Sequence, residues 1–249
     1  MTELVTIDPE TDQDLILLAR RYRKAGGVGM QVLNLVGGQA ENLLERLPDA
    51  VKDRLESATE QALTTALRAA SRSRSVVPDQ RSWLNVAMTT AMGAAGGAGG
   101  LPSALVELPV TTTVLLRIIQ GVAADYGFDP QTEAIQKECL AVFSSAGPLA
   151  ADDGADMAFL AARVTLTGAT MHAAIARVAP RLAAVLGQKL AAQTLPVIGA
   201  ATGAATNFAY TSYYQEIAHV HFGLLDLGRR RGLQPEQMRQ LLAQAMTAL

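Results

Sequence analysis

Two side chains in the last fifth of the chain have a spacing that is used in metal chemistry. Glu216 and His219 are three residues apart, which places both on one helix face and matches half of the motif that builds di-metal carboxylate bundles. A complete site needs this motif twice and two further glutamates, whereas the chain contains it once. We therefore expect no bound metal and no other cofactor.

Two charges are nearly alone in a long apolar stretch. Glu107 and Arg117 must pair or become neutral if they cannot reach water, because an isolated buried charge is costly. One interpretation is a soluble enzyme with an internal polar site formed by Glu107, Arg117, Asp125, Glu216 and His219. The other is structural: Glu107 stabilises the N-terminus of the next helix, and Arg117 pairs with a carboxylate such as Asp125 or Glu216. We favour the structural interpretation and keep the enzyme as the alternative.

Two short basic clusters lie on either side of the apolar middle. They are Arg20, Arg21, Arg23 and Lys24, and Arg229, Arg230 and Arg231. The helix dipole favours cations at the C-terminal end of a helix, so each cluster could be a solvated helix end. Near anionic lipid each basic residue adds up to about 1 kcal/mol of attraction, so both clusters together could hold the protein on a membrane surface if they share a face.

Glycines four residues apart occur in two charge-free stretches, residues 82–106 and 190–215. The spaced residues are Gly93 and Gly97 in the first stretch and Gly199, Gly203 and Asn207 in the second. This spacing lets a second helix approach closely, so we expect a glycine zipper in the centre of the fold. Alanine and glycine dominate both stretches and gain little in lipid, so neither is predicted to span a membrane.

Elsewhere the apolar residues repeat with the 3.6-residue period of helices, and no segment alternates as a strand does. The sequence predicts an all-α fold, a multi-helix bundle with Gly/Ala-rich, close-packed central helices. The expected helices span residues 12–24, 28–36, 49–73, 110–126, 131–145, 157–177, 180–194 and 196–227, with a last one from Pro235. We expect one domain over residues 1–249, in which helices of residues 1–46 could lie at the periphery, residues 47–228 form the core and residues 229–249 form a C-terminal helix.

Glycine and proline set the expected helix ends. Gly26 and Gly27 are expected to end the first helix. Pro109 and Pro130 suit the first turn of the helices that follow them, with Asp129 as the N-cap of the second.

Composition excludes some classes of protein. The net charge is −2 and only 4% of residues are aromatic, so we expect no nucleic-acid partner. The single cysteine, Cys139, fits a reducing compartment. Residues 2–14 are acidic and lack the basic and apolar regions of a signal peptide, so we expect a cytoplasmic protein.

Three passages in this order resemble the EcsC family of bacterial proteins. They are residues 107–117 (ELPVTTTVLLR), residues 124–130 (ADYGFDP) and residues 195–207 (LPVIGAATGAATN). The family is named for the third gene of an operon that encodes an ABC exporter, its members are largely of unknown function, and some are thought to associate with membranes. The resemblance implies membrane lipids or a membrane protein such as an ABC exporter as partners, and it brings no catalytic residues.

These observations together favour a membrane-associated accessory protein without an assigned reaction. We expect it to act at the cytoplasmic face, peripherally at the inner membrane, through contacts with lipid or a membrane protein. Self-association of the alanine-rich helices is a further possibility, and the soluble enzyme remains the alternative.

Overall fold

The computed structural model describes residues 9–35, 45, 47–74, 100–145, 166, 168–193 and 199–249. All regular structure in these ranges is helical, which confirms the all-α prediction. The described helices are α1 (Pro9–Leu35), α2 (Asp49–Arg74), α4 (Gly100–Asp125), α5 (Glu133–Val142), α7 (Met171–Gln193), α8 (Gly199–Arg231) and α9 (Pro235–Thr247).

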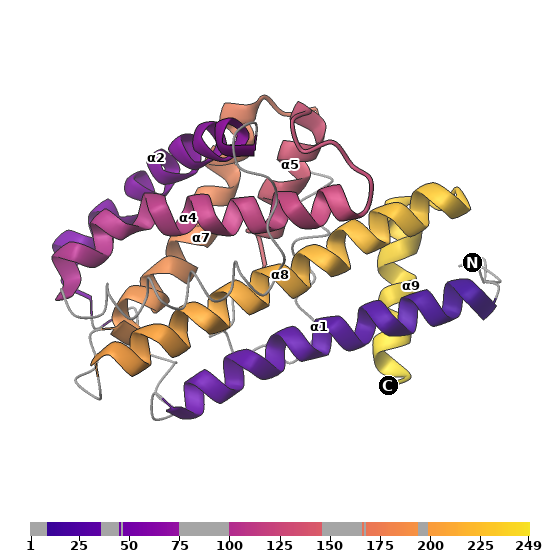
Figure 1. Ribbon diagram of the computed structural model, residues 1–249, viewed down its shortest axis with the longest axis horizontal. Helices are drawn as coiled ribbons and strands as arrows, with labels where there is room; N and C mark the ends of the chain where they lie inside the picture. Colours follow the sequence, from indigo (N-terminus) through magenta and orange to yellow (C-terminus); the bar gives the residue numbers. More distant parts are fainter. Residues whose placement is uncertain are drawn as a thin grey trace.

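The central helix of the bundle is α8. It is 33 residues long and extends along the molecule, with α1 on one side and α4 on the other (Figure 1). α2 packs on α4 and α7, and α9 packs on α1 and on the end of α8. α1 and α8 run antiparallel, since Asp14 pairs with Arg230 whereas the later Arg21 pairs with the earlier Glu216.

One continuous cluster of buried apolar side chains forms the core, and every described helix contributes to it. α1 contributes as well, because its residues Leu15, Leu18 and Tyr22 are buried in this cluster. The apolar face of α1 is therefore covered mainly by α8, its most extensive neighbour.

Three expected helix breaks are absent from the structure. α1 continues through Gly26 and Gly27, α4 includes Pro109 and α7 includes Pro180, so these predicted helix ends were wrong. A glycine in a helix costs about 1 kcal/mol and an interior proline about 3 kcal/mol. Burying the apolar face of a long helix contributes more than these local costs. Residues 157–165 of an expected helix lie outside the described residues.

The start of α5 also differs from the prediction. Thr132, not Asp129, is its N-cap residue. The Asp129 carboxylate instead accepts a hydrogen bond from the backbone N–H of Gln131 at 2.9 Å, which stabilises a turn ahead of the helix. By contrast, α2 and α9 begin where the sequence predicts.

Candidate functional site

The structure brings part of the predicted polar site together. Glu216 and His219 lie on α8, and Asp125 is the last residue of α4 and is exposed. The adjacent Tyr126 ring lies edge-on to the His219 ring, with 5.9 Å between the ring centroids. Three of the five candidate residues therefore gather where α1, α4 and α8 meet.

The other two candidates belong to α4. Arg117 lies half-buried in α4. Glu107 also belongs to α4, but its side chain lies outside the described residues. The expected pairs of Arg117 with Asp125 or Glu216 thus stay untested.

Glu216 holds two cations of α1 (the N-terminal helix) against α8. Its Oε2 accepts a hydrogen bond from Arg21 Nη1 at 2.7 Å, and its Oε1 accepts one from Lys24 Nζ at 2.8 Å. Burial alone would raise the pKa of Glu216, but the hydrogen bonds and charges of Lys24 and Arg21 outweigh it and hold the pKa below its ordinary value. The ionised carboxylate therefore has both oxygens engaged in joining two helices.

His219 completes this polar group one turn further along α8. Burial lowers its pKa, and the nearby charge of Arg21 lowers it further. Burial raises the pKa of the Tyr126 hydroxyl, because it disfavours the charged form there too. Both side chains are therefore neutral at pH 7, and His219 contributes a ring contact rather than a charge. Within the described part of the chain, no three His, Cys, Asp or Glu side chains are grouped so that they could hold a metal ion.

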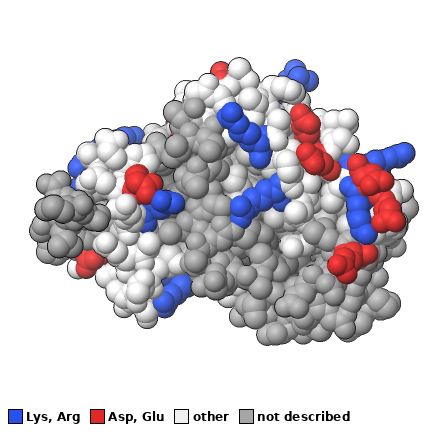
Figure 2. Space-filling view, turned by 180° about the vertical axis from the view of Figure 1, so that it is seen from behind, with Lys and Arg blue, Asp and Glu red and all other residues white. Residues whose placement is uncertain are grey.

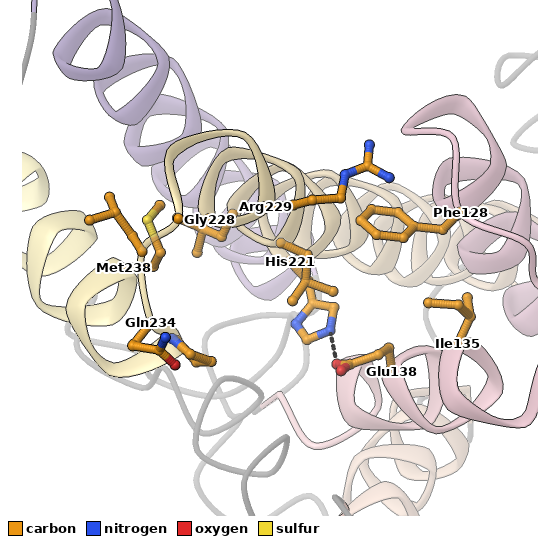
Figure 3. Close-up of a pocket in the computed structure, with 13 residues that line it drawn as sticks. Phe128, Ile135, Glu138, His221, Gly228, Arg229, Gln234 and Met238 are labelled. Carbon is orange, nitrogen blue, oxygen red and sulfur yellow. Dashed lines mark hydrogen bonds and ion pairs between the residues drawn. The ribbon is translucent and has the colours of Figure 1, made fainter.

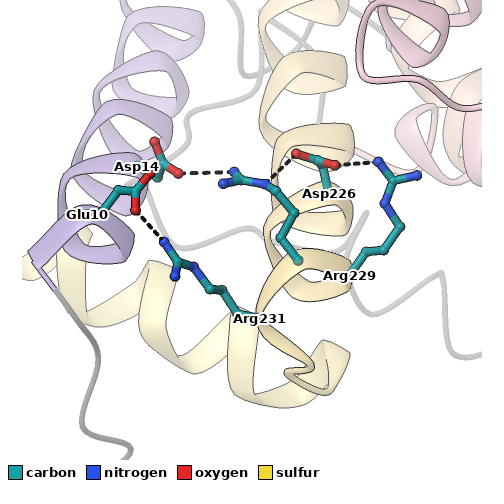
Figure 4. A network of polar contacts seen from close by, with 6 residues as sticks. Glu10, Asp14, Asp226, Arg229 and Arg231 are labelled. Carbon is teal, nitrogen blue, oxygen red and sulfur yellow. Dashed lines mark hydrogen bonds and ion pairs between the residues drawn. The ribbon is translucent and has the colours of Figure 1, made fainter.

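The second basic cluster is paired with acidic residues (Figure 4). Arg229 and Arg230 donate hydrogen bonds to the Asp226 carboxylate at 2.7 and 2.9 Å. Arg230 also reaches Asp14 at 3.1 Å, and Arg231 reaches Glu10 at 2.9 Å. The chain thus has reciprocal pairing: basic residues of α1 bind an acid of α8, and basic residues of α8 bind acids of α1.

The remaining predicted lipid-contact residues lie on α1. Arg23 donates a hydrogen bond to the backbone carbonyl of Met246 in α9 at 2.8 Å. Arg20 is exposed and has no hydrogen-bond or ion-pair partner among the described residues. On the face of the molecule that lies behind the view of Figure 1, acidic and basic side chains also lie close to one another toward the two ends (Figure 2).

Close helix packing is seen at a glycine that the sequence analysis did not select. A Cβ atom on Gly223 of α8 would lie 2.6 Å from Leu18 Cδ2 and 3.2 Å from the Tyr126 hydroxyl. This glycine has no second glycine four residues away, so the spacing rule could not find it. Asn207 is buried in α8. Gly199 and Gly203 lie in the first turns of α8, Gly93 and Gly97 lie outside the described residues, and the glycine zipper stays a prediction.

A pocket of about 480 Å³ lies between α5, the end of α8 and the start of α9. Most of its walls are apolar, and His221 and Glu138 face each other in it (Figure 3). His221 Nε2 lies 2.9 Å from Glu138 Oε2, and the His221 side chain has no exposed surface. At the wall, the Arg229 guanidinium carbon lies 4.9 Å from the centroid of the Phe128 ring.

The His221–Glu138 pair is the polar contact that sequence reasoning missed. The two residues are 83 positions apart, so no local spacing connects them. The pair joins α5 to α8, and both of its residues line the pocket. None of the five predicted polar residues is among the described lining residues of this pocket or of a second one between α2 and α7.

The fold and these sites define an all-α bundle protein whose charged side chains join its helices. None of the described helices combines the length and the hydropathy needed to cross a bilayer. The sequence model of the EcsC protein family matches residues 74–224, and the chain belongs to this family. No curated protein and no solved structure matches the chain. The matched range ends before α9 and leaves out α1.

Proposed function

We propose that the protein is an accessory protein at the cytoplasmic face of the membrane, and that residues 17–24 of α1 contact anionic lipid. The observation that carries this proposal is the exposed apolar side chain of Leu17, which is 58% exposed. Arg20 and Lys24 follow it by three and seven residues and therefore lie on the same helix face. An apolar side chain among cations is typical of contact with an anionic bilayer surface.

Acidic and basic residues of α1 lie in separate segments of the helix. The acidic residues Glu10, Asp12 and Asp14 precede Leu17, and four basic residues follow it between residues 20 and 24. Glu216 offsets one of these cations, which leaves a net charge of about +3 and an attraction of up to about 3 kcal/mol. Burying Leu17 adds roughly 1 kcal/mol.

A total of about 4 kcal/mol corresponds to half-saturation near 1 mM lipid. Such a contact is weak and reversible, with an affinity about tenfold below that of a single acyl anchor. We therefore include in the proposal a membrane-protein partner, such as an ABC exporter, that supplies the remaining affinity. The lipid contact would then orient the protein.

The alternative of an enzyme built on the five polar residues has less support. Glu216 already binds two cations, and Asp125 is exposed at a helix end. A catalytic acid or base needs a reacting group within hydrogen-bond reach, and neither of the two pockets described above is lined by these residues.

Co-sedimentation with phosphatidylglycerol and phosphatidylcholine vesicles at low salt tests the lipid contact. We expect binding to the anionic vesicles only, lost in 0.5 M salt and lost in the double variant Leu17→Ser/Arg20→Glu. This variant keeps both partners of Glu216. The control Val110→Ser/Arg54→Glu changes one exposed apolar and one exposed basic residue on α4 and α2 and should bind normally. Equal loss in both variants, or no binding of the wild type, would show that the proposal is wrong.

A further inference from the structure

We infer that the second pocket, between α2 and α7, binds a small anionic amphiphile: a carboxylate or phosphate head on a short hydrocarbon body. The inference goes beyond the proposed membrane contact and does not depend on it. The pocket is formed by α2, α5 and α7 and receives no residue from α1. In the bundle, α4 and α8 lie between α1 and α2 (Figure 1).

The pocket has the size of a small-molecule site. Its volume is about 540 Å³, within the range of roughly 300–1,000 Å³ that ligand pockets occupy. A surface that recognises another protein is usually flatter and wider than this. The volume therefore favours a compact ligand over a macromolecule.

The inner part of the pocket is apolar. Leu67 of α2 and Ile175 of α7 line it and are almost fully buried, and Met171 beside them is partly buried. An inorganic anion would leave this surface without a partner. A hydrocarbon chain would cover it and gain the free energy of leaving water.

The outer part of the pocket is cationic. Arg68 and Arg72 are exposed one turn apart on α2, and His172 of α7 is exposed beside them. Of the lining residues that the structure describes, none is acidic. Neither Arg68 nor His172 has a hydrogen-bond or ion-pair partner among the described residues. Guanidinium groups bind carboxylates and phosphates with two parallel hydrogen bonds, so this rim is complementary to an anionic head.

The start of α7 adds to this complementarity. Met171 is the first residue of the helix, and its first turn contains no acidic side chain. Met171 and His172 of this turn line the pocket together with the arginines, so the positive end of the helix dipole lies close to the rim and favours an anion there. Charge at the rim and hydrocarbon inside together specify a ligand that has both an anionic and an apolar part.

A ligand-detected NMR titration with butanoate, hexanoate and octanoate below micelle formation tests the inference. We expect saturable binding that strengthens roughly fourfold per added methylene, from about 0.8 kcal/mol per buried CH₂. Inorganic phosphate and hexanol, which each carry one half of the ligand, should bind at least tenfold more weakly than hexanoate. Phosphate binding as strong as hexanoate, or no saturable binding of octanoate, would overturn the inference.

The arginine rim is tested with Arg68→Gln and a matched control on the same helix. Arg68→Gln should weaken octanoate binding at least tenfold, whereas Arg54→Gln, which is exposed on α2 outside the pocket, should change it less than twofold. Equal affinities of the two variants would overturn the assignment of the head group. Thermal unfolding confirms that both variants are folded.

Binding of the Arg68→Gln variant to phosphatidylglycerol vesicles shows whether the amphiphile is a bilayer lipid or a free molecule. If Arg68→Gln also abolishes vesicle binding, the ligand is a bilayer lipid. If vesicle binding is unchanged, the ligand is a free amphiphile. The lipid-contact variant Leu17→Ser/Arg20→Glu should retain octanoate binding in either case, so failure of the proposed membrane contact and failure of this site can be distinguished.

Discussion

Replacing Glu216 by glutamine tests whether this carboxylate fastens α1 to α8. The Glu216 side chain is 11% exposed, and its partners Arg21 and Lys24 are 43% and 69% exposed. Breaking a fully buried ion pair costs about 3–5 kcal/mol, and an exposed pair contributes at most about 1 kcal/mol. The two cations can rehydrate here, so we expect Glu216→Gln to lower the free energy of unfolding by about 1–2 kcal/mol, or the Tm by about 3–6 °C.

The effect should depend on pH with a defined sign. The pKa of Glu216 in the folded protein lies below its ordinary value near 4.5. Its charge therefore stabilises the fold fully above that value, and the stabilisation is lost as the pH falls through the lower folded-state pKa. In urea unfolding at pH 7, 5 and 3.5, the difference between wild type and Glu216→Gln should narrow only below about pH 5.

A matched substitution separates this effect from a general loss of charge. Glu236 pairs with Arg239 on the surface of α9, with both side chains well exposed, so Glu236→Gln should cost less than about 0.5 kcal/mol. A Glu216→Gln effect that is equally small at pH 7, or that stays constant down to pH 3.5, would refute the reasoning.

Four further substitutions concern packing and buried polar groups, and the effect of each is measured by urea or thermal unfolding. Gly223→Ala should destabilise by about 1 kcal/mol or more, because the added Cβ meets a buried leucine. Gly121→Ala should stabilise by about 0.5–1 kcal/mol, because its Cβ meets nothing within 4 Å; changes of the same sign would contradict the packing argument. Tyr210→Phe should cost about 1–2 kcal/mol, since its hydroxyl donates a buried hydrogen bond of 2.9 Å to the Val185 carbonyl, and an unchanged Tm would place that hydroxyl in water. Gln120→Met should raise the Tm by about 2 °C or more, because neither polar atom of this buried amide has a hydrogen-bond partner among the described residues; a lower Tm would indicate a bound water or ligand instead.

Local signals in the sequence were sufficient for some helix ends and not for others. α2 and α9 begin as predicted because Pro48 directly precedes α2 and Pro235 is the first residue of α9, and each proline acts through its own backbone. Gly26–Gly27 and Pro180 failed as end signals, because packing along neighbouring helices outweighs local propensity. The all-α fold class was predictable, since apolar residues repeat with the helical period over most of the chain.

Only the part of the polar site that lies within a single helix was predictable. Glu216 and His219 share α8, and their spacing alone shows that they lie on one face. The partners of Glu216 are Arg21 and Lys24, 195 and 192 positions away, and periodicity does not tell which helix will lie beside α8. His221 and Glu138 escaped prediction for the same reason. Pairing between distant segments is a property of tertiary packing, which no window of neighbouring residues contains.

The pairing of α1 with α8 also has a consequence for biosynthesis. The ion pairs between the two helices join residues that are 192 to 221 positions apart. At a translation rate of about 5–20 residues per second, α1 leaves the ribosome about 10–45 s before its partner. During that time Leu15, Leu18 and Tyr22 have no α8 to cover them. The nascent chain therefore presents an uncovered amphipathic helix to chaperones, to other nascent chains and to nearby bilayers until α8 has been made.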